Sequence, residues 1–410
     1  MRRWLWIGLI GLVVLLWARS YWEVYAEQGL FIWFGTDFRH YTAQAMALRL
    51  GDLETVYSRV SGVKYGQPLV VYSNYPDLVL EATLVPYPPL FAWLFIPFTL
   101  PPPPLGFALW TGLNLLAVAY LTWRVASCLP AAWRPWAAFV VVAAFPNGYA
   151  LYLGQVMILL GCAFVECYLA LRAGREFRAG LWLACLLFKP QYGVLLGVLL
   201  LWKRRWRVVA GVAAGGAIIA VASLLIVGVQ PLLALPAAIL DLTERFSGAG
   251  TQTHPEDMVN WRKLVRYLAV GIGRLGPWIT EDQAVLLTVA LSIVTGVLAL
   301  VAWRGPWVPS EPLFPTKMAL LLLATILASY HSHAYGPMLL LAPVATMFAA
   351  GQGSRSTRVL LLVMAVLPSL LWVTVFRGYI VALAVLVVAC FGALLAEVWL
   401  ARRAPSFRPS

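Results

Sequence analysis

The stretch GLWLACLLFKPQYGVLLGVLLLW, residues 180–202, decides the fold class. It is apolar on both sides of a polar break at Lys189-Pro190-Gln191. Proline lacks a backbone N–H and ends a helix, so the break frees backbone groups that must face protein or a water-filled cavity. A lysine within so apolar a segment is costly unless it meets an anion. The stretch therefore predicts a broken membrane segment that carries a polar site.

Apolar segments of this kind recur from one end of the chain to the other. The protein has 410 residues, of which 62% are hydrophobic and only 11% charged, whereas soluble domains carry about 25% charged residues. Roughly 20 apolar residues suffice to cross the hydrocarbon core of a bilayer. We therefore expect an all-α integral membrane protein with about 12 transmembrane helices, roughly 11 to 13. It forms one polytopic domain over residues 1–403, followed by a short cytoplasmic tail over residues 404–410.

The positive charge of the chain indicates membrane topology rather than nucleic-acid binding. The net charge is +13, but Lys and Arg occur as short clusters between apolar segments, which is the positive-inside pattern. With these clusters inside, both termini are cytoplasmic, and two long loops at about 21–87 and 230–282 lie outside. Residues 1–20 resemble a signal peptide, but Trp17 and Trp22 crowd the candidate cleavage site, so we interpret this segment as a retained span.

Short elements at the outer membrane surface are expected near and within these loops. The apolar run 88–100 covers only ~20 Å as a helix, which predicts a re-entrant or interfacial element rather than a crossing. In the second loop, residues 255–268 place apolar side chains on one helical face and Arg262, Lys263 and Arg266 on another. This pattern is typical of an interfacial helix.

Polar residues interrupt the apolar background at positions that the predicted topology brings to the outer face. These residues are Asp37, Tyr87, Gln155, Lys189 with Gln191, and His331 with His333. Structural roles also fit several of them. Asp37 could cap the helix that begins at Phe38, Lys189 could extend toward the outer headgroups, and Gln155 could simply bond a neighbouring helix.

The two histidines and the one acid inside a span invite separate interpretations. His331 and His333 lie two residues apart, so on a helix they would point to different sides, and one of them is expected to reach a site. Glu166 lies within an apolar segment and is expected to be paired inside the bundle.

The residue types at the outer face suit group transfer from a lipid phosphate. A carboxylate can take a proton from an attacking hydroxyl, and lysine or histidine can stabilise the charge that develops on a departing phosphate. The sequence has no Gly-rich phosphate loop on the inner side and no cluster of acids, so we expect neither a metal site nor a cofactor.

The order of the motifs resembles glycosyltransferase family 87 from about residue 1 to residue 400. The motifs that carry the resemblance are Asp37-Phe38 through Tyr57, Tyr87-Pro88-Pro89-Leu90-Phe91, Gly154-Gln155-Val156, Lys189-Pro190-Gln191, Asn260 before a basic amphipathic helix, and Ser329-Tyr330-His331-Ser332-His333. The family includes polyprenol-phosphate-mannose-dependent α-mannosyltransferases of phosphatidylinositol mannoside synthesis. The resemblance implies a GT-C fold, with its active site at the outer face and two long outer loops that carry short interfacial helices.

The resemblance also assigns roles to residues and implies an inverting, metal-independent transfer. Asp37 matches the general base, one of His331 and His333 matches the histidine near the donor phosphate, and Lys189 and Gln191 match the basic hairpin motif. The candidates for the substrate pocket are Arg39, Tyr41, Tyr87, Gln155 and Asn260.

The sequence departs from the family pattern at two places. Ala334 and Gly336 stand where the family often has acids, which leaves the acceptor open. Arg39 replaces the second acid of the paired-acid protein transferases, which argues against a protein O-mannosyltransferase.

The expected function is transfer of a hexose, most simply mannose, from polyprenyl phosphate to a glycolipid or glycan hydroxyl outside the plasma membrane. The expected partners are this donor, the acceptor and the lipid bilayer, with no nucleic acid. A transporter or flippase of a lipid-linked sugar is the rival class, although no internal repeat supports it. A glycan polymerase or ligase that uses lipid-linked donors is a further alternative.

Overall fold

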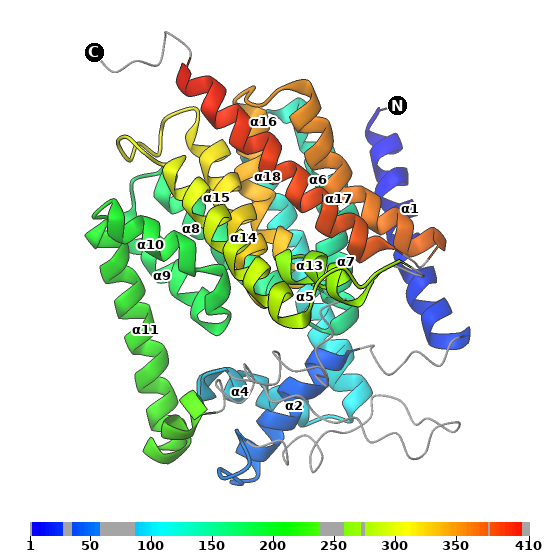
Figure 1. Ribbon diagram of the computed structural model, residues 1–410. Helices are drawn as coiled ribbons and strands as arrows, with labels where there is room; N and C mark the ends of the chain where they lie inside the picture. Colours follow the sequence, from blue (N-terminus) through cyan, green and yellow to red (C-terminus); the bar gives the residue numbers. More distant parts are fainter. Residues whose placement is uncertain are drawn as a thin grey trace.

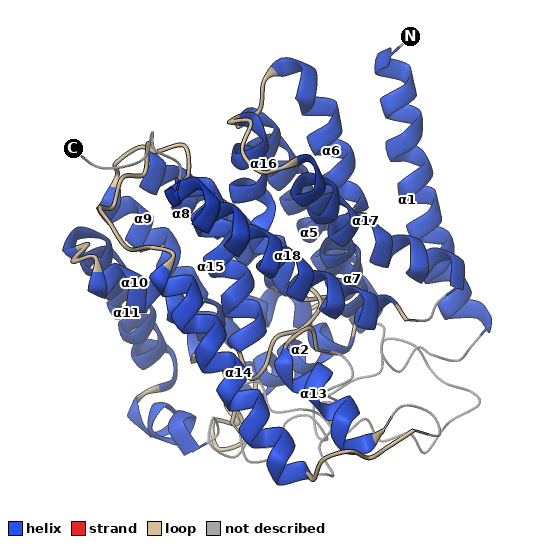
Figure 2. Ribbon diagram, turned by 45° about the horizontal axis from the view of Figure 1, so that its top comes forward, coloured by secondary structure: helices blue, strands red, loops and turns tan. Residues whose placement is uncertain are grey.

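The computed structural model of the chain describes residues 2–27, 35–57, 87–237, 258–271, 275–375 and 378–403. Over these ranges the regular secondary structure is helical (Figure 2), and an isolated antiparallel bridge pairs Met258 with His333. The predicted tail 404–410 and large parts of both predicted outer loops lie outside the described residues. The all-α class predicted from the sequence is confirmed for the part of the chain that is described.

Within these ranges, five helices are long and apolar enough to cross a membrane. They are α5 (Pro103–Ser127), α11 (Trp206–Val227), α14 (Glu281–Val301), α17 (Arg355–Val375) and α18 (Tyr379–Arg403). A sixth span would combine η3 (Ala131–Trp133) and α6 (Arg134–Ala143) with α7 (Phe145–Leu153), across a bend of 40°. The protein is therefore a membrane protein, while the twelve crossings expected from the sequence stay a prediction.

The remaining helices are shorter, except α1 (Arg2–Glu27), which runs along α6 and α17. The others are α2 (Thr36–Arg49), α4 (Pro89–Phe95), η2 (Ile96–Thr99), α8 (Met157–Arg172), α9 (Glu176–Leu183), η4 (Ala184–Phe188), η5 (Pro190–Tyr192), α10 (Val194–Trp202), α13 (Trp261–Val270), α15 (Phe314–Ala328), η7 (Gly336–Leu340) and α16 (Leu341–Ala349).

Helix α15 is the centre of the bundle. Every residue from Phe314 to Leu327 is buried, as is expected of a helix that is apolar on all sides. It contacts α14, α18, α16, α10 and η7 (Figure 1). Because α15 ends at Ala328, the chain leaves the core of the protein directly into the segment 329–335.

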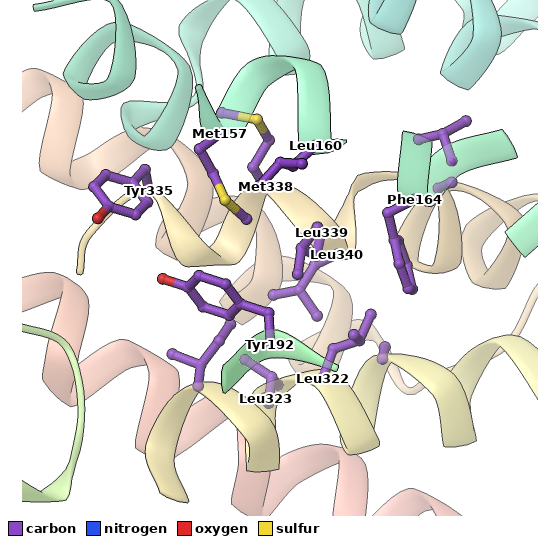
Figure 3. Packing of buried hydrophobic residues seen from close by; sticks show 14 of the residues in the cluster. Met157, Leu160, Phe164, Tyr192, Leu322, Leu323, Tyr335, Met338, Leu339 and Leu340 are labelled. Atoms are coloured by element: carbon purple, nitrogen blue, oxygen red, sulfur yellow. The ribbon is translucent and has the colours of Figure 1, made fainter. Parts of the chain in front are cut away.

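The segment that follows α15 rests on an apolar floor. Figure 3 shows Tyr335 and Tyr192 at the edge of this floor, with Met157, Met338 and Leu339 packed around them. All five side chains are 3% exposed or less. Since both tyrosines are anchored in the core through their rings, their hydroxyl groups have fixed positions at its polar margin.

Close backbone approach holds α11 to α9. A Cβ atom added at Gly180 would lie 2.1 Å from the carbonyl oxygen of Val208, and one added at Gly211 would lie 2.2 Å from that of Phe177. Small residues allow helix backbones to approach closely in membranes. This contact fixes α9, and hence the polar break that follows it, against an otherwise poorly buried helix.

Helices α2 and α4 lie together at the end of the bundle opposite the two termini (Figure 1). Aromatic side chains join them, with the ring centroids of Tyr41 and Phe91 4.9 Å apart and those of Tyr41 and Phe95 5.0 Å apart. The run 88–100 forms α4 and η2, which accords with the short element expected there. The aromatic cluster anchors α2, which carries Asp37.

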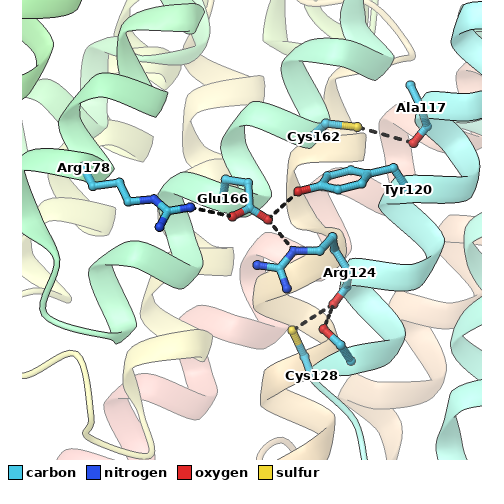
Figure 4. A network of polar contacts seen from close by, with 8 residues as sticks. Ala117, Tyr120, Arg124, Cys128, Cys162, Glu166 and Arg178 are labelled. Atoms are coloured by element: carbon cyan, nitrogen blue, oxygen red, sulfur yellow. Dashed lines mark hydrogen bonds and ion pairs between the residues drawn. The ribbon is translucent and has the colours of Figure 1, made fainter.

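The acid inside a span is paired, as expected. Glu166 on α8 accepts a hydrogen bond from Tyr120 Oη at 2.9 Å and forms ion pairs with Arg124 and, at 3.9 Å, with Arg178 (Figure 4). Both Tyr120 and Arg124 belong to α5, so the network ties α8 to α5 and to the start of α9. Its role is structural, because its partners satisfy the carboxylate.

Candidate active site

Asp37 lies in the first turn of α2 without capping that helix. Gly35 is the N-cap residue, with φ 65° and ψ 21°, and no side chain caps the helix. The prediction that Asp37 caps a helix beginning at Phe38 is therefore wrong, because the helix begins earlier, at Thr36. The carboxylate points instead to Gln155, whose Nε2 donates to Asp37 Oδ2 at 2.7 Å.

Gln155 joins the base candidate to a tyrosine. Its Oε1 accepts a hydrogen bond from Tyr41 Oη at 2.5 Å and another from the backbone N–H of Val156 at 3.0 Å. The amide is therefore oriented with its nitrogen toward Asp37. Gln155 thus bonds the neighbouring helix α2, as the structural alternative expected, and one of its partners there is the carboxylate of Asp37.

Gly154 makes this arrangement sterically feasible. It ends α7 in the left-handed conformation with φ 68°, which favours glycine. A Cβ atom there would lie 2.6 Å from Cβ of Phe38. Trp110 Nε1 also donates to the carbonyl oxygen of Gly154 at 2.8 Å. These contacts fix α7 against α2 and so place Gln155 beside Asp37.

Burial raises the pKa of Asp37 from 3.8 to about 6, although the charge of Lys189 and the hydrogen bond from Gln155 act in the opposite direction. Such a carboxyl group is ionised at neutral pH and yet is more basic than an ordinary aspartate. A pKa close to the working pH is what a general base requires.

Lys189 lies at the break between η4 and η5 and is only 3% exposed. Its Nζ donates to Tyr335 Oη at 3.1 Å and lies 4.7 Å from the ring centroid of Tyr335 and 5.6 Å from that of Tyr87. The lysine therefore points inward, and the prediction that it extends to the outer headgroups is wrong.

The two histidines lie side by side. Their Nε2 atoms are 3.0 Å apart and their ring centroids 4.5 Å apart. The expectation that they diverge on a helix is wrong, because α15 ends before them at Ala328. The pKa of His331 is lowered by burial first and then by the nearby charges of His333, Lys189 and Arg262. His331 is therefore neutral near pH 7.

Gln191 and Asn260 hold this segment from two sides. Gln191 Nε2 donates to the carbonyl oxygen of His331 at 3.5 Å. Asn260 Nδ2 donates to the carbonyl oxygens of Ser329 and Tyr330 at 2.8 and 3.1 Å, while its Oδ1 caps α13 by accepting from the backbone N–H of Lys263. Asn260 is completely buried. It is a clamp between α13 and the histidine segment.

Helix α13 differs from the interfacial helix expected over 255–268. It begins at Trp261, and residues 255–257 lie outside the described ranges. Lys263 was expected on the charged outer face, but it is only 3% exposed. The reason is that α13 packs against α14 and turns this face of its first turn toward protein.

Arg39 is 6% exposed and donates to Thr36 Oγ1 at 3.5 Å. Burial, and to a smaller extent the charge of Arg39, lower the pKa of His40 to about 3. Arg39 therefore lies near the start of α2, as Asp37 does.

The structure adds one residue that the sequence interpretation missed. Tyr335 receives the hydrogen bond from Lys189 and lies 5.4 Å, ring to ring, from His333. The sequence offered one indication of Tyr335, because this residue follows His333 of the Ser329–His333 motif by two positions. In the described ranges, no three His, Cys, Asp or Glu side chains gather as a metal site would require.

An apolar pocket opens a short way along the chain from this polar site. Its wall includes Pro337 and Met338, which follow Tyr335, and Asn147 of α7. The other lining residues come from the end of α5, from α6, from α16 and from α17. The pocket is thus separate from the polar residues but is connected to them through η7 and α7.

Comparison with known proteins identifies the family. A profile of glycosyltransferase family 87 matches residues 85–329, more than half of the chain. The match includes Tyr87, Gln155, Lys189, Gln191 and Asn260, while Asp37 and the histidine pair lie outside it. Neither a curated protein nor a solved structure matches the chain. The family suggested by the motif order is confirmed, and the chain, a membrane glycosyltransferase, belongs to glycosyltransferase family 87.

Proposed function

We propose that the protein transfers a hexose, most simply mannose, from polyprenyl phosphate to a hydroxyl group of a glycolipid or glycan. The observation that carries this proposal is the position of Asp37. Its carboxylate accepts a hydrogen bond from Gln155, and it lies close enough to Lys189 to interact with the charge of the ammonium group. A carboxylate and a buried cation within one polar site are the two groups that transfer from a lipid phosphate requires.

The proposed reaction is a single displacement. Asp37 takes the proton of the acceptor hydroxyl as that oxygen attacks the anomeric carbon of the donor sugar. The bond between the anomeric carbon and the phosphate oxygen breaks, and its electron pair leaves with polyprenyl phosphate. Attack in line with the departing oxygen inverts the anomeric configuration. The raised pKa of Asp37 supports the role of base, because the carboxylate is ionised but holds a proton better than an exposed one.

The departing phosphate is proposed to lie against Lys189 and the histidine pair. Among the described residues, the buried ammonium group of Lys189 forms its hydrogen bond with Tyr335 rather than with a carboxylate, so an anion would offset its cost of burial. His331 and His333 contact each other and can donate one N–H toward a phosphate oxygen. Gln191 holds the backbone of His331 in place.

A lipid-linked donor accords with the apolar pocket and the membrane helices. The pocket begins two residues after Tyr335 and is lined almost throughout by apolar side chains. An isoprenoid chain could occupy such a surface at little desolvation cost. Nucleotide sugars, by contrast, are not available outside the cytoplasm.

The outer location of the site is proposed from charge and shape together. Both termini lie at one end of the bundle, and α2 and α4 lie at the other (Figure 1). The basic clusters near both termini and in the connections after α8, α10 and α16 favour a cytoplasmic position for the end that carries the termini. The site beside α2 then faces the outside of the plasma membrane.

The test uses the full-length protein in reconstituted vesicles, supplied with radiolabelled polyprenyl-phosphate-mannose and a lipid extract from the host. Wild type is compared with Asp37→Asn and with Asp282→Asn, which removes an exposed acid in the first turn of α14. We expect label to move to acceptor with wild type and Asp282→Asn, and transfer to be lost with folded Asp37→Asn.

Other outcomes separate the alternatives. Equal transfer by Asp37→Asn would remove Asp37 from catalysis. Movement of labelled lipid between leaflets without product would identify a flippase, and products that grow by whole oligosaccharides would identify a polymerase or ligase.

A further inference from the structure

Two arginines on α13 have buried N–H groups that the transfer mechanism does not use. Among the described residues, neither Nη1 of Arg262 nor Nε of Arg266 has a hydrogen-bond partner, although both atoms are buried. An unpaired buried donor on a guanidinium group costs stability. These two donors are therefore available to a group that accepts hydrogen bonds.

The two guanidinium groups share one side of the helix. Arg262 and Arg266 are four residues apart, so their side chains are neighbours along α13. The charge of Arg266 acts unfavourably on Arg262. Glu281, at the start of α14, also acts on Arg262, but no ion pair joins the two residues in the described part of the chain. Two unneutralised arginines side by side fit an anion that carries several oxygen atoms.

The arginine pair lies next to the histidine segment. The guanidinium carbon of Arg262 is 4.2 Å from the ring centroid of Tyr330, which precedes His331. The stacking fixes the plane of the guanidinium group. The β-bridge between Met258 and His333, and the hydrogen bond from the backbone N–H of Val259 to the carbonyl oxygen of Ser332, fix the start of α13 against this segment.

We propose that Arg262 and Arg266 bind the phosphate group of a lipid substrate. This inference rests on the proposed function and adds a second anion-binding element to Lys189 and the histidine pair. The chemistry is that of a lipid phosphate, since the planar fork of arginine matches phosphate oxygens in pairs. Two sources supply it in the proposed reaction: the phosphate of the polyprenyl donor, and a phosphodiester in the headgroup of a glycolipid acceptor.

The test measures binding first, so that it does not depend on transfer. Purified full-length protein in a phosphate-free maltoside detergent is titrated with radiolabelled polyprenyl phosphate and, separately, with a radiolabelled phosphate-bearing glycolipid. The variants are Arg262→Gln and the double variant with Arg266→Gln. Arg207→Gln is the matched control, because it removes an exposed positive charge at the start of α11. Arg262→Lys keeps the charge but loses the planar fork.

We expect the double variant to weaken binding of one of the two lipids by about tenfold or more, which is the loss expected from removing a charge-assisted hydrogen bond. Arg262→Lys should lie between wild type and Arg262→Gln, and Arg207→Gln should bind as wild type does. Weakened binding of polyprenyl phosphate would assign the site to the donor, and weakened binding of the glycolipid alone would assign it to the acceptor. Binding of both lipids within twofold of wild type in the folded double variant would overturn the proposal.

Transfer assays on the same variants separate the two proposals. If wild type binds lipid phosphate through the arginines but transfers no sugar, the arginine site stands and the proposed function fails. If transfer proceeds and the KM values for donor and acceptor are unchanged in the double variant, the function stands and the arginine site fails.

Discussion

Gln155 Nε2 donates a 2.7 Å hydrogen bond to Asp37 Oδ2 across 118 residues of sequence. The same side chain accepts from Tyr41 Oη, so one buried amide fixes the carboxylate relative to both α2 and α7. Because the amide donates to the ionised form of Asp37, it lowers the pKa of that carboxyl group and orients it at the same time.

Gln155→Leu should therefore weaken transfer and shift its pH dependence. Loss of the donor raises the pKa of Asp37 further, so the acid limb of the kcat profile should move to higher pH. We expect kcat at neutral pH to fall by about tenfold to a hundredfold, as for other positioned general bases. Asp282→Asn is the control, because it changes an exposed side chain at the start of α14 and leaves Gln155 and its partners intact. An unshifted profile in Gln155→Leu would contradict this role.

The ionisation of Asp37 itself sets a second pH dependence. Transfer should fall as the pH drops through about 6, since the base is then protonated. For stability the sign is opposite: a carboxyl group whose pKa is raised by folding stabilises the fold while protonated and loses this contribution as the pH rises through about 6.

Asp37→Asn should consequently resist heat better than wild type at about pH 8 and differ little at about pH 3, where the carboxyl group is protonated in both the folded and the unfolded state. The difference is on the order of 2–3 kcal/mol at most, from the size of the pKa change. Thermal unfolding in detergent at both pH values checks it. A variant less stable than wild type at the higher pH would show that the ionised carboxylate is a net stabilising group.

Gly154→Ala should destabilise the protein and reduce transfer together. The new Cβ would lie 2.6 Å from Cβ of Phe38 at a position with φ +68°, which costs roughly 1–3 kcal/mol or more. Gly112→Ala on α5 is the matched control, because no atom lies within 4 Å of its added Cβ. We expect the control to melt at or above the wild-type temperature. Equal melting of both variants would argue against the close packing of α7 on α2.

Asn260→Asp should distinguish the two roles of this side chain, which caps α13 and holds the backbone of Ser329 and Tyr330. Aspartate retains the oxygen that caps α13 but loses the two hydrogen bonds donated to Ser329 and Tyr330. We expect a raised KM for the donor, with a stability loss of about 1–2 kcal/mol from the two unpaired carbonyl groups. Asn260→Ala, which loses the cap as well, should melt lower still. Wild-type KM in a folded Asn260→Asp variant would show that the clamp does not position the histidine segment.

Glu166→Gln should affect stability and leave transfer kinetics unchanged. Removing the charge weakens the contacts with Arg124 and Arg178, which costs roughly 1–2 kcal/mol because Glu166 is buried while both arginines reach solvent. Urea or heat denaturation measures the loss. The KM and kcat of the folded fraction should match wild type, and a changed kcat would bring Glu166 into the functional machinery.

Local patterns in the sequence predicted several features of the site. The apolar segments around Lys189-Pro190-Gln191 predicted a helix break, and α9 with η4 and η5 confirms it. The pairing of Glu166 was also predicted, because an isolated acid in an apolar span needs a cation. The two histidines were misplaced, since their divergence assumed that a helix continues past Ala328, where α15 in fact ends.

What the sequence by itself determined is the class of the molecule and most of the polar residues that the structure brings together. Hydrophobicity and charge asymmetry act locally, so they can be recognised along the chain without knowledge of any contact. The tertiary structure alone decided which residues meet: Asp37 with Gln155, Lys189 with Tyr335, and Arg262 with Tyr330. Such contacts depend on how helices distant in the sequence pack, at Gly154 and around α15 above all. No periodicity within one segment specifies the side chain that faces it from another.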